Sequence, residues 1–380
     1  MHLRLHAIDS QSPGHVAPSE PAASAALRQY GILAAVNRYR RLLIPILLLP
    51  PMLACSAATR LITGSNPSAT DSVGASPSPS VQETAPVDGA SCPLETAAIL
   101  RASEAESPVL TTFPRVSTHD SLFAPLVTYT VQGDALSAPV LADVPKNLLK
   151  YQADAASQRS AWGLFTALIP ADQRAMLSQF QIVTDGPGGV LSAVEQTAND
   201  PRSWLLAIDI ADASDTKNLS FTLLHEFGHL LTLSPAQVPP DPNIFNDPQS
   251  PRQRNRALAA CPNYFPGEGC SLPDSYLNQF YARYWNDIFE QWQSIDSIQD
   301  DVRRDSRLDD FFHRYSDRFV DSYAATSPSE DIAETWAYYI LNPKPVGSSI
   351  ADQKLRFFYE YPELVSLREQ ILKRLCAVHP

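Results

Sequence analysis

Three stretches of the chain combine β-branched, aromatic and aliphatic residues in the short runs that are typical of β-strands. They are "LVTYTV" at 126–131, "FQIVTD" at 180–185 and "WLLAIDIAD" at 204–212. The glycine-rich "GPGG" that separates the last two favours a turn. These runs predict a small sheet in the first part of the folded chain.

Other segments place apolar residues three and four positions apart, which is typical of amphipathic helices. The first helix is predicted at 144–168, with Pro145 in its first turn. A second helix is predicted to contain the stretch 221–234. It is expected to begin near Asp215–Asn218, where capping residues cluster. After Asp274 the pattern is almost wholly helical, at 275–295, 308–324, 329–341 and 353–375. Strands first and helices afterwards indicate an α+β domain over 92–380, with an α+β part at 92–234 and a helical part at 235–380.

The N-terminal 91 residues lack these patterns. Residues 56–91 are rich in Pro, Ser, Ala and Gly without aromatics, which predicts a disordered tether. Residues 1–55 end in "NRYRRLLIPILLLPPMLACS", a basic cluster and a short apolar run before Cys55. This run suits a secretory signal better than a membrane-spanning helix. "MLAC" resembles a bacterial lipoprotein cleavage box, which implies a lipid anchor at Cys55; a plain signal peptide or a short uncleaved anchor is the alternative.

The remaining cysteines suggest disulfides in a protein exported to the cell envelope or secreted. Cys261 and Cys270 would close a short loop, and Cys92 and Cys376 would then join the two ends of the folded domain. Free buried thiols are the alternative. Two other pairings of the four cysteines are also possible.

Charge excludes one class of partner. Residues 1–54 carry a balance of +3, which leaves −15 for the rest of a chain whose total is −12. An acidic body repels phosphate backbones, so we expect no nucleic-acid partner.

Candidate chemistry lies in "FTLLHEFGHLLTLS" at 221–234. His225 and His229 are four residues apart, so both imidazoles lie on one helix face and can bind one zinc ion. Glu226 lies beside them and is placed to take a proton from water. Gly228 leaves room for another element to approach. The alternative is a core helix with two satisfied histidines, because the short His-Glu-x-x-His motif also occurs by chance.

A tetrahedral site needs a third protein ligand. Thr232 and Pro235 stand where the metzincin pattern requires a glycine and a histidine, which excludes that pattern. "YAATSPSEDIAETWAYYI" at 323–340 offers Glu330 and Glu334 one turn apart, on a helix that Ser327 or Ser329 could cap. One carboxylate would bind the metal and the other a histidine. The alternatives are Asp331 as the ligand and a solvated acidic first turn.

The pair "HEFGH" and "EDIAETWA" resembles the gluzincin metallopeptidases, and more narrowly the bacterial zinc metallopeptidases related to the catalytic domain of anthrax lethal factor. The resemblance covers about residues 180–341 and implies a zincin-like fold. It also implies Glu330 as the third ligand of one Zn²⁺ ion and Glu334 as the partner of a ligating histidine. Tyr323, seven positions before Glu330, would by the same resemblance stabilise the oxyanion.

These residues predict a zinc metallopeptidase that acts on a peptide or protein substrate, with Glu226 as the general base. We expect the strand at 204–212 to be the edge strand that aligns the substrate. His119 and His313 are isolated and are expected to be surface or structural residues. The alternatives are a catalytically silent scaffold lipoprotein at the cell surface and a non-peptidase zinc hydrolase.

Overall fold

The computed structural model describes residues 92–106, 124–184 and 186–380. The predicted leader with Cys55, the predicted tether and His119 lie outside the described residues. Among the helices of the described ranges, none has both the length and the apolar character that crossing a membrane requires.

The first part of the fold contains every strand of the described chain and four α-helices. Its elements are α1 (Pro93–Glu106), β1 (Ala124–Gln132), β2 (Ala135–Leu136), β3 (Val140–Leu141), α2 (Leu149–Gln152), α3 (Ala155–Leu168), β4 (Leu177–Thr184), β5 (Ser192–Thr197), β6 (Asp200–Asp209) and α4 (Thr216–Thr232).

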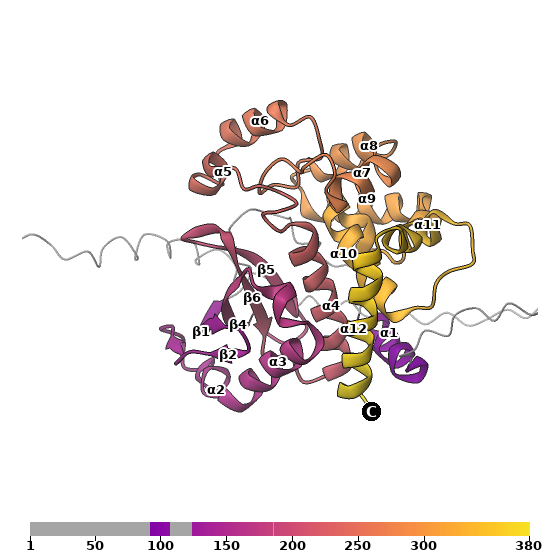
Figure 1. The fold of residues 1–380 in the computed structure, drawn as a ribbon. Coiled ribbons are helices and arrows are strands. Elements are labelled where there is room, and N and C mark those ends of the chain that lie inside the picture. Colours follow the sequence, from indigo (N-terminus) through magenta and orange to yellow (C-terminus); the bar gives the residue numbers. More distant parts are fainter. Residues whose placement is uncertain (1–91, 107–123, 185) are drawn as a thin grey trace, which may run out of the picture. The chain divides into compact units, whose positions relative to one another are not determined.

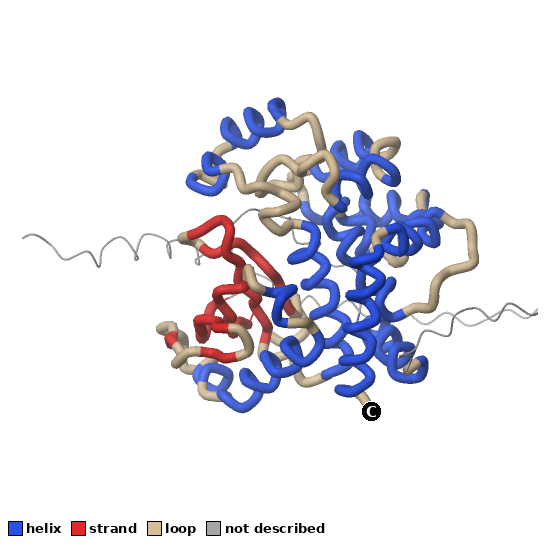
Figure 2. Tube along the Cα trace, in the orientation of Figure 1, coloured by secondary structure: helices blue, strands red, loops and turns tan. Residues whose placement is uncertain are grey.

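The second part is helical, apart from its loops (Figure 2). Its helices are α5 (Pro242–Asn246), α6 (Pro251–Ala260), α7 (Tyr276–Tyr284), α8 (Phe289–Asp296), α9 (Asp301–Arg314), α10 (Pro328–Leu341), α11 (Ile350–Phe357) and α12 (Pro362–Val378), with a short 3-10 helix η4 (Tyr323–Thr326) before α10. The predicted α+β class is therefore confirmed for the described residues.

Four of the predicted helical segments are divided in the structure. The segment 275–295 forms α7 and α8, and the segment 353–375 lies in α11 and α12. The helix predicted at 144–168 is two helices, because the Asp154 side chain accepts the backbone N–H of Ser157 and starts α3 there. Pro145 lies before both of them, not in a first turn. The helix predicted at 308–324 ends with α9 at Arg314 and continues as short 3-10 turns.

The strands form one mixed sheet in the order β2-β1-β4-β6-β5, with β3 also pairing with β1. β4 and β6 are parallel, and the remaining pairs are antiparallel. The prediction that the 204–212 segment is an edge strand is wrong, because β6 lies between β4 and β5. Its last six residues are all buried, as expected of a central strand.

β5 is the edge strand beside β6, and the sequence-based prediction missed it. A two-residue turn at 198–199 joins β5 to β6 as a hairpin. The strand reads "SAVEQT", with few apolar residues and a partly buried middle. The pattern of apolar positions therefore gives little sign of a strand here.

Helix α4 connects the two parts. It packs against α3 and β5 on the side of the sheet, and against α10 and α1 on the other side (Figure 1). A Cβ atom on Gly228 would stand 2.9 Å from the Cα atom of Ala333 in α10. Only glycine therefore lets these two helices approach this closely, as the sequence predicted. The contact brings together the helix with the two histidines and the helix with the two glutamates.

Both predicted disulfides are present. Cys92, just before α1, is bonded to Cys376 in α12, and Cys261 is bonded to Cys270. The first bond joins residues 284 positions apart and fixes the start of the described chain to its last helix. Closing so long a loop removes much conformational freedom from the unfolded chain.

Candidate metal centre

Helix α4 holds its two histidines and Glu226 in a rigid, buried position. The helix begins at its N-cap Asp215, whose side chain accepts the backbone N–H groups of Lys217 and Asn218. This confirms the predicted start. His225, Glu226 and His229 are only 6%, 5% and 8% exposed. Their polar groups thus need partners inside the protein.

Helix α10 supplies those partners. Its N-cap is Ser327, not Ser329, and the Ser327 hydroxyl accepts the backbone N–H of Glu330 at 3.1 Å. Pro328 follows in the first turn, where proline favours a helix start. The cap fixes which way Glu330 and Glu334 face. Both are directed toward α4 and bond to its histidines.

Three ligand atoms converge on one point. Nε2 of His225 and Nε2 of His229 each lie 3.1 Å from Oε2 of Glu330, and the two nitrogens are 3.0 Å apart. Ligand atoms placed tetrahedrally at roughly 2.0–2.1 Å from a zinc ion stand about 3.3 Å from one another. The triangle is therefore close to the size that a single metal ion requires.

Glu334 determines which nitrogen of His225 faces the triangle. Its Oε2 lies 2.5 Å from Nδ1 of His225, so we assign the ring proton to Nδ1. In the neutral form of His225, Nε2 then directs a lone pair at Glu330. Two lone pairs that face each other repel, and a divalent cation between them removes the repulsion. The donor set of two imidazoles and one carboxylate thus fits a zinc ion.

The electrostatics of the cluster favour added positive charge. Burial would lower the pKa of His225, but Glu334 and Glu330 raise it well above its ordinary value. Burial would raise the pKa of Glu330, but His229 and His225 hold it below its ordinary value. His225 is thus stabilised as a cation and Glu330 as an anion. The same surroundings stabilise a metal cation.

Glu226 faces the cluster without joining the triangle. Its Oε1 accepts a hydrogen bond from the hydroxyl of Ser192, in β5, at 3.0 Å. Burial raises the pKa of Glu226, while His225 and His229 oppose the rise. A carboxylate with a raised pKa takes up a proton more readily, which suits an acid–base group. Ser192 was not among the residues singled out from the sequence, because β5 itself was missed.

Tyr323 also lies at the cluster. Its ring packs edge-on against His225, with 5.6 Å between the ring centroids, and its hydroxyl hydrogen-bonds to Glu330. Burial, together with Glu330 and Glu226, raises its pKa well above the ordinary value. The hydroxyl therefore keeps its proton and is available as a donor. The position matches the predicted place of Tyr323, and its role stays a prediction.

Asp321 extends the cluster behind Glu334. It hydrogen-bonds to Glu334 and to Tyr338, and its Oδ1 accepts the backbone N–H of Ala324 at 2.9 Å. Burial and the charge of Glu334 raise the pKa of Asp321 well above its ordinary value. We therefore assign a proton to the Asp321 side of this carboxyl pair. No sequence motif marks Asp321, because the fold alone brings it to Glu334.

Asp331, the alternative ligand, faces away from the histidines. Its Oδ2 pairs with Nζ of Lys354 and accepts the indole N–H of Trp285, and its Oδ1 accepts the hydroxyl of Thr335. Asp331 and Lys354 are both fully buried. Glu330 is therefore the carboxylate of this turn that lies with the two histidines.

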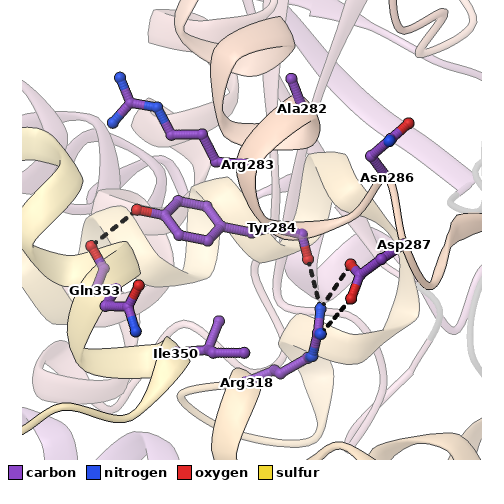
Figure 3. A pocket seen from close by; sticks show the side chains of 8 residues that line it. All are labelled: Ala282, Arg283, Tyr284, Asn286, Asp287, Arg318, Ile350 and Gln353. Atoms are coloured by element: carbon purple, nitrogen blue, oxygen red, sulfur yellow. Dashed lines mark hydrogen bonds and ion pairs between the residues drawn. The ribbon is translucent and has the colours of Figure 1, made fainter.

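Two further features carry no comparable chemistry. His313 is exposed and pairs with Asp309, so it is a surface residue, as predicted. A cavity of about 200 Å³ lies between α7, α11 and Arg318 (Figure 3). Arg318 in its wall already bonds to Asp287 and Arg283 to Glu360. Both cations of the cavity are thus neutralised within the protein.

Comparison with protein-family models, with curated proteins and with solved structures found no match to the chain. Any function must therefore be argued from the site itself.

Proposed function

We propose that the protein is a zinc-dependent metallopeptidase with a zincin-like fold of the gluzincin type. The observation that carries the proposal is the triangle of His225, His229 and Glu330, whose ligand atoms lie 3.0–3.1 Å apart. Among the described residues, these three side chains form the one group of His, Cys, Asp or Glu that could hold a metal ion. Glu226 beside it supplies the acid–base group that hydrolysis needs.

A zinc ion at this site would supply Lewis acidity, which makes water more acidic and polarises the carbonyl of the substrate. Glu226 would take the proton of the attacking water and pass it to the leaving amine. The hydroxyl of Ser192 orients Glu226 for both steps. Tyr323 would donate its hydroxyl proton in a hydrogen bond to the developing oxyanion.

The edge strand β5 supports a peptide as the substrate. Its residue Ser192 bonds to Glu226, so the strand passes directly beside the acid–base group. Among the described strands only β6 pairs with β5, which leaves its other edge without a strand partner. An extended peptide could add to that edge by main-chain hydrogen bonds. In this proposal β5 takes the aligning role that the sequence had suggested for β6.

Conversion of Glu226 to Gln tests the proposed function. Purified full-length wild type is expected to cleave an unfolded, fluorescently labelled protein, and a chelator should stop the cleavage. Glu226→Gln should lower the rate by at least about 10²-fold while retaining zinc. Glu290→Gln is the matched control, because Glu290 is exposed on α8. An equal rate for Glu226→Gln and wild type would contradict the assigned base.

The same proteins, assayed on small esters as well, distinguish the other function classes. A wild type that holds zinc but cleaves neither proteins nor small esters would be a catalytically silent scaffold. Hydrolysis of esters alone, dependent on Glu226, would indicate a non-peptidase zinc hydrolase.

We also propose that the protein acts outside the cytoplasm, lipid-anchored through Cys55 or secreted. The two disulfides support this, because such bonds persist in oxidising compartments. Expression of Cys55→Ser in a bacterial host tests the anchor. Release of the variant from the membrane fraction is expected, and unchanged fractionation would contradict it.

A further inference from the structure

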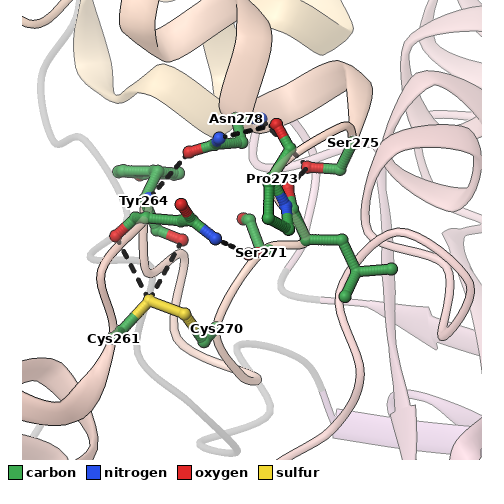
Figure 4. Close-up of a disulfide and its surroundings, with 9 residues drawn as sticks. Cys261, Tyr264, Cys270, Ser271, Pro273, Ser275 and Asn278 are labelled. Atoms are coloured by element: carbon green, nitrogen blue, oxygen red, sulfur yellow. Dashed lines mark hydrogen bonds between the residues drawn. A yellow bond between two sulfur atoms is a disulfide. The ribbon is translucent and has the colours of Figure 1, made fainter.

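The loop closed by Cys261 and Cys270 is held rigidly in place (Figure 4). Directly after the loop, the backbone N–H of Ser271 donates to the carbonyl of Tyr264 at 3.0 Å. The backbone N–H of Tyr264 donates to Oδ1 of Asn278, in α7, also at 3.0 Å. The disulfide, one loop contact and one helix contact together fix the path of 261–270.

The same loop is attached to the segment that leaves the histidine helix. The backbone carbonyl of Glu268 accepts the N–H of Asp241 at 2.8 Å. A Cβ atom on Gly269 would stand 2.0 Å from the carbonyl oxygen of Pro239, so only glycine allows this approach. Residues 268–269 are thus held against 239–241, which follow the end of α4.

The loop also contacts the helix that carries the third ligand. The hydroxyl of Tyr264 is buried and hydrogen-bonds to Ser329, the residue before Glu330. The loop therefore touches α10 directly and reaches α4 through the segment that follows it.

Three buried polar atoms in this region have no hydrogen-bond partner among the described residues. They are Nδ1 of His229, Oε2 of Glu268 and Oγ of Ser271. A histidine that binds a metal through Nε2 carries its proton on Nδ1, so it needs an acceptor there. A buried carboxylate oxygen needs a donor. Nδ1 of His229 and Oε2 of Glu268 are therefore a complementary donor and acceptor.

Glu268 lies close enough to His229 for the two groups to interact electrostatically. Burial raises the pKa of Glu268, while a hydrogen bond from its own backbone N–H and the charge of His229 oppose the rise. Of the neighbouring charged side chains, His229 opposes it most. A cationic group of a substrate is a less suitable partner for Glu268, because Oε2 is buried and the substrate would have to displace the protein atoms that cover it. His229 is itself inside the protein and needs no such displacement.

We propose that the disulfide loop is part of the metal centre and that Glu268 accepts the Nδ1–H of His229, directly or through one bridging water molecule. Glu268 would then orient His229 as Glu334 orients His225. Each ligating histidine would have its own carboxylate, one from α10 and one from the loop. This inference rests on the proposed zinc site, but not on peptide cleavage.

Zinc affinity of the full-length protein, measured against a competing chelator, tests the role of Glu268. Glu268→Ala is expected to weaken zinc binding by about 10–100-fold. Glu268→Gln keeps an acceptor oxygen and should recover part of the loss. Asp274→Ala is the matched control, because Asp274 is an exposed acidic residue close to the same loop. It should bind zinc as the wild type does.

Two further readouts separate positioning from a general effect on folding. In zinc-loaded wild type, the Nδ1–H proton of His229 should give a downfield resonance that Glu268→Ala loses. A Cys261→Ser/Cys270→Ser variant should also weaken zinc binding. Adding Glu268→Ala to it should weaken binding no further, because both changes remove the same support.

Three results would overturn the proposal. The first is a Glu268→Ala variant with wild-type zinc affinity. The second is additive losses in the combined variant. The third is unchanged zinc affinity with weaker cleavage of cationic peptides only, which would place Glu268 in a substrate subsite. Failure of the proposed function gives a different result. A wild type that binds zinc without cleaving peptides would refute the peptidase, and the zinc affinities of wild type and Glu268→Ala could still be compared.

Discussion

Glu330 and Asp331 are neighbours on α10, and the fold gives them opposite surroundings. Asp331 faces an internal lysine, Lys354, with Trp285 and Thr335 completing its hydrogen bonds. The ion pairs that the described residues make with Glu330 are to His225 and His229, and no Lys or Arg joins them. One buried carboxylate carries its own counter-ion, and the other lies in a cluster that only imidazoles balance. The difference suggests that the second cluster takes its positive charge from outside the protein.

Loss of the internal lysine should give the largest change in stability. Lys354→Met leaves Asp331 buried without a counter-ion, which should lower the free energy of unfolding by about 3–5 kcal/mol. Urea unfolding of the full-length protein measures this. A double variant, Lys354→Met/Asp331→Leu, removes the uncompensated charge and should recover a large part of the loss. A single variant as stable as the wild type would contradict the assigned importance of this pair.

Loss of Glu334 should affect the metal more than the fold. Glu334→Gln weakens the acceptor for Nδ1 of His225, so zinc affinity should fall by about 10–100-fold. The metal-free variant should unfold at about the same urea concentration as the metal-free wild type, because the lost interaction with His225 is offset by the removal of one buried negative charge. Competition with a chelator measures the first effect and urea unfolding the second. A large loss of stability without loss of zinc affinity would contradict this, because Glu334 would then act like the Asp331–Lys354 pair, as a structural group.

Change of pH should affect the metal-free and the zinc-loaded cluster in opposite directions. Burial lowers the pKa of His225, but Glu334 and Glu330 raise it well above its ordinary value of about 6.5. This interaction stabilises the metal-free protein fully below about pH 6.5, and the stabilisation is lost as the pH rises through the folded value. Zinc competes with the proton of cationic His225, so zinc affinity should rise as the pH increases through the folded pKa of His225.

Urea unfolding of chelator-treated protein and zinc titrations at matched pH values check both trends. Stability and zinc affinity that both rise with pH would show that His225 is not the group that titrates. A Lys354→Met/Asp331→Leu protein serves as the control, because its metal cluster is unchanged.

Loss of the Ser192 hydroxyl should give the smallest effect. Ser192→Ala removes one hydrogen bond to Glu226, worth about 1 kcal/mol, and leaves the ligands untouched. The rate of peptide cleavage should fall by about fivefold at unchanged zinc affinity. A loss as large as that of Glu226→Gln would mean that Ser192 itself takes part in the chemistry.

Local signals in the sequence predicted the local features of this site. The i, i+4 spacing placed His225 and His229 on one face, and the cluster of capping residues located the start of α4 at Asp215. Gly228 predicted the close approach of a second element. Each of these depends on residues within one helix or on one missing side chain.

Features that depend on how distant segments meet were predicted less well. The order of strands cannot be read from one strand, so β6 was expected at the edge although its continuous buried run fits a central strand. Ser192, Asp321 and Glu268 reach the cluster from three different segments, and no spacing rule connects them. Their neighbours in the sequence therefore gave no sign of their place.

Zinc content tests the central claim most directly. Full-length wild type, Glu330→Gln and the Lys354→Met/Asp331→Leu variant would be loaded with zinc, freed of excess by gel filtration and measured by elemental analysis. The predicted result is one zinc ion per chain for the wild type and for the Asp331 variant, and almost none for Glu330→Gln. No zinc in the wild type, or full zinc in Glu330→Gln, would contradict the claim.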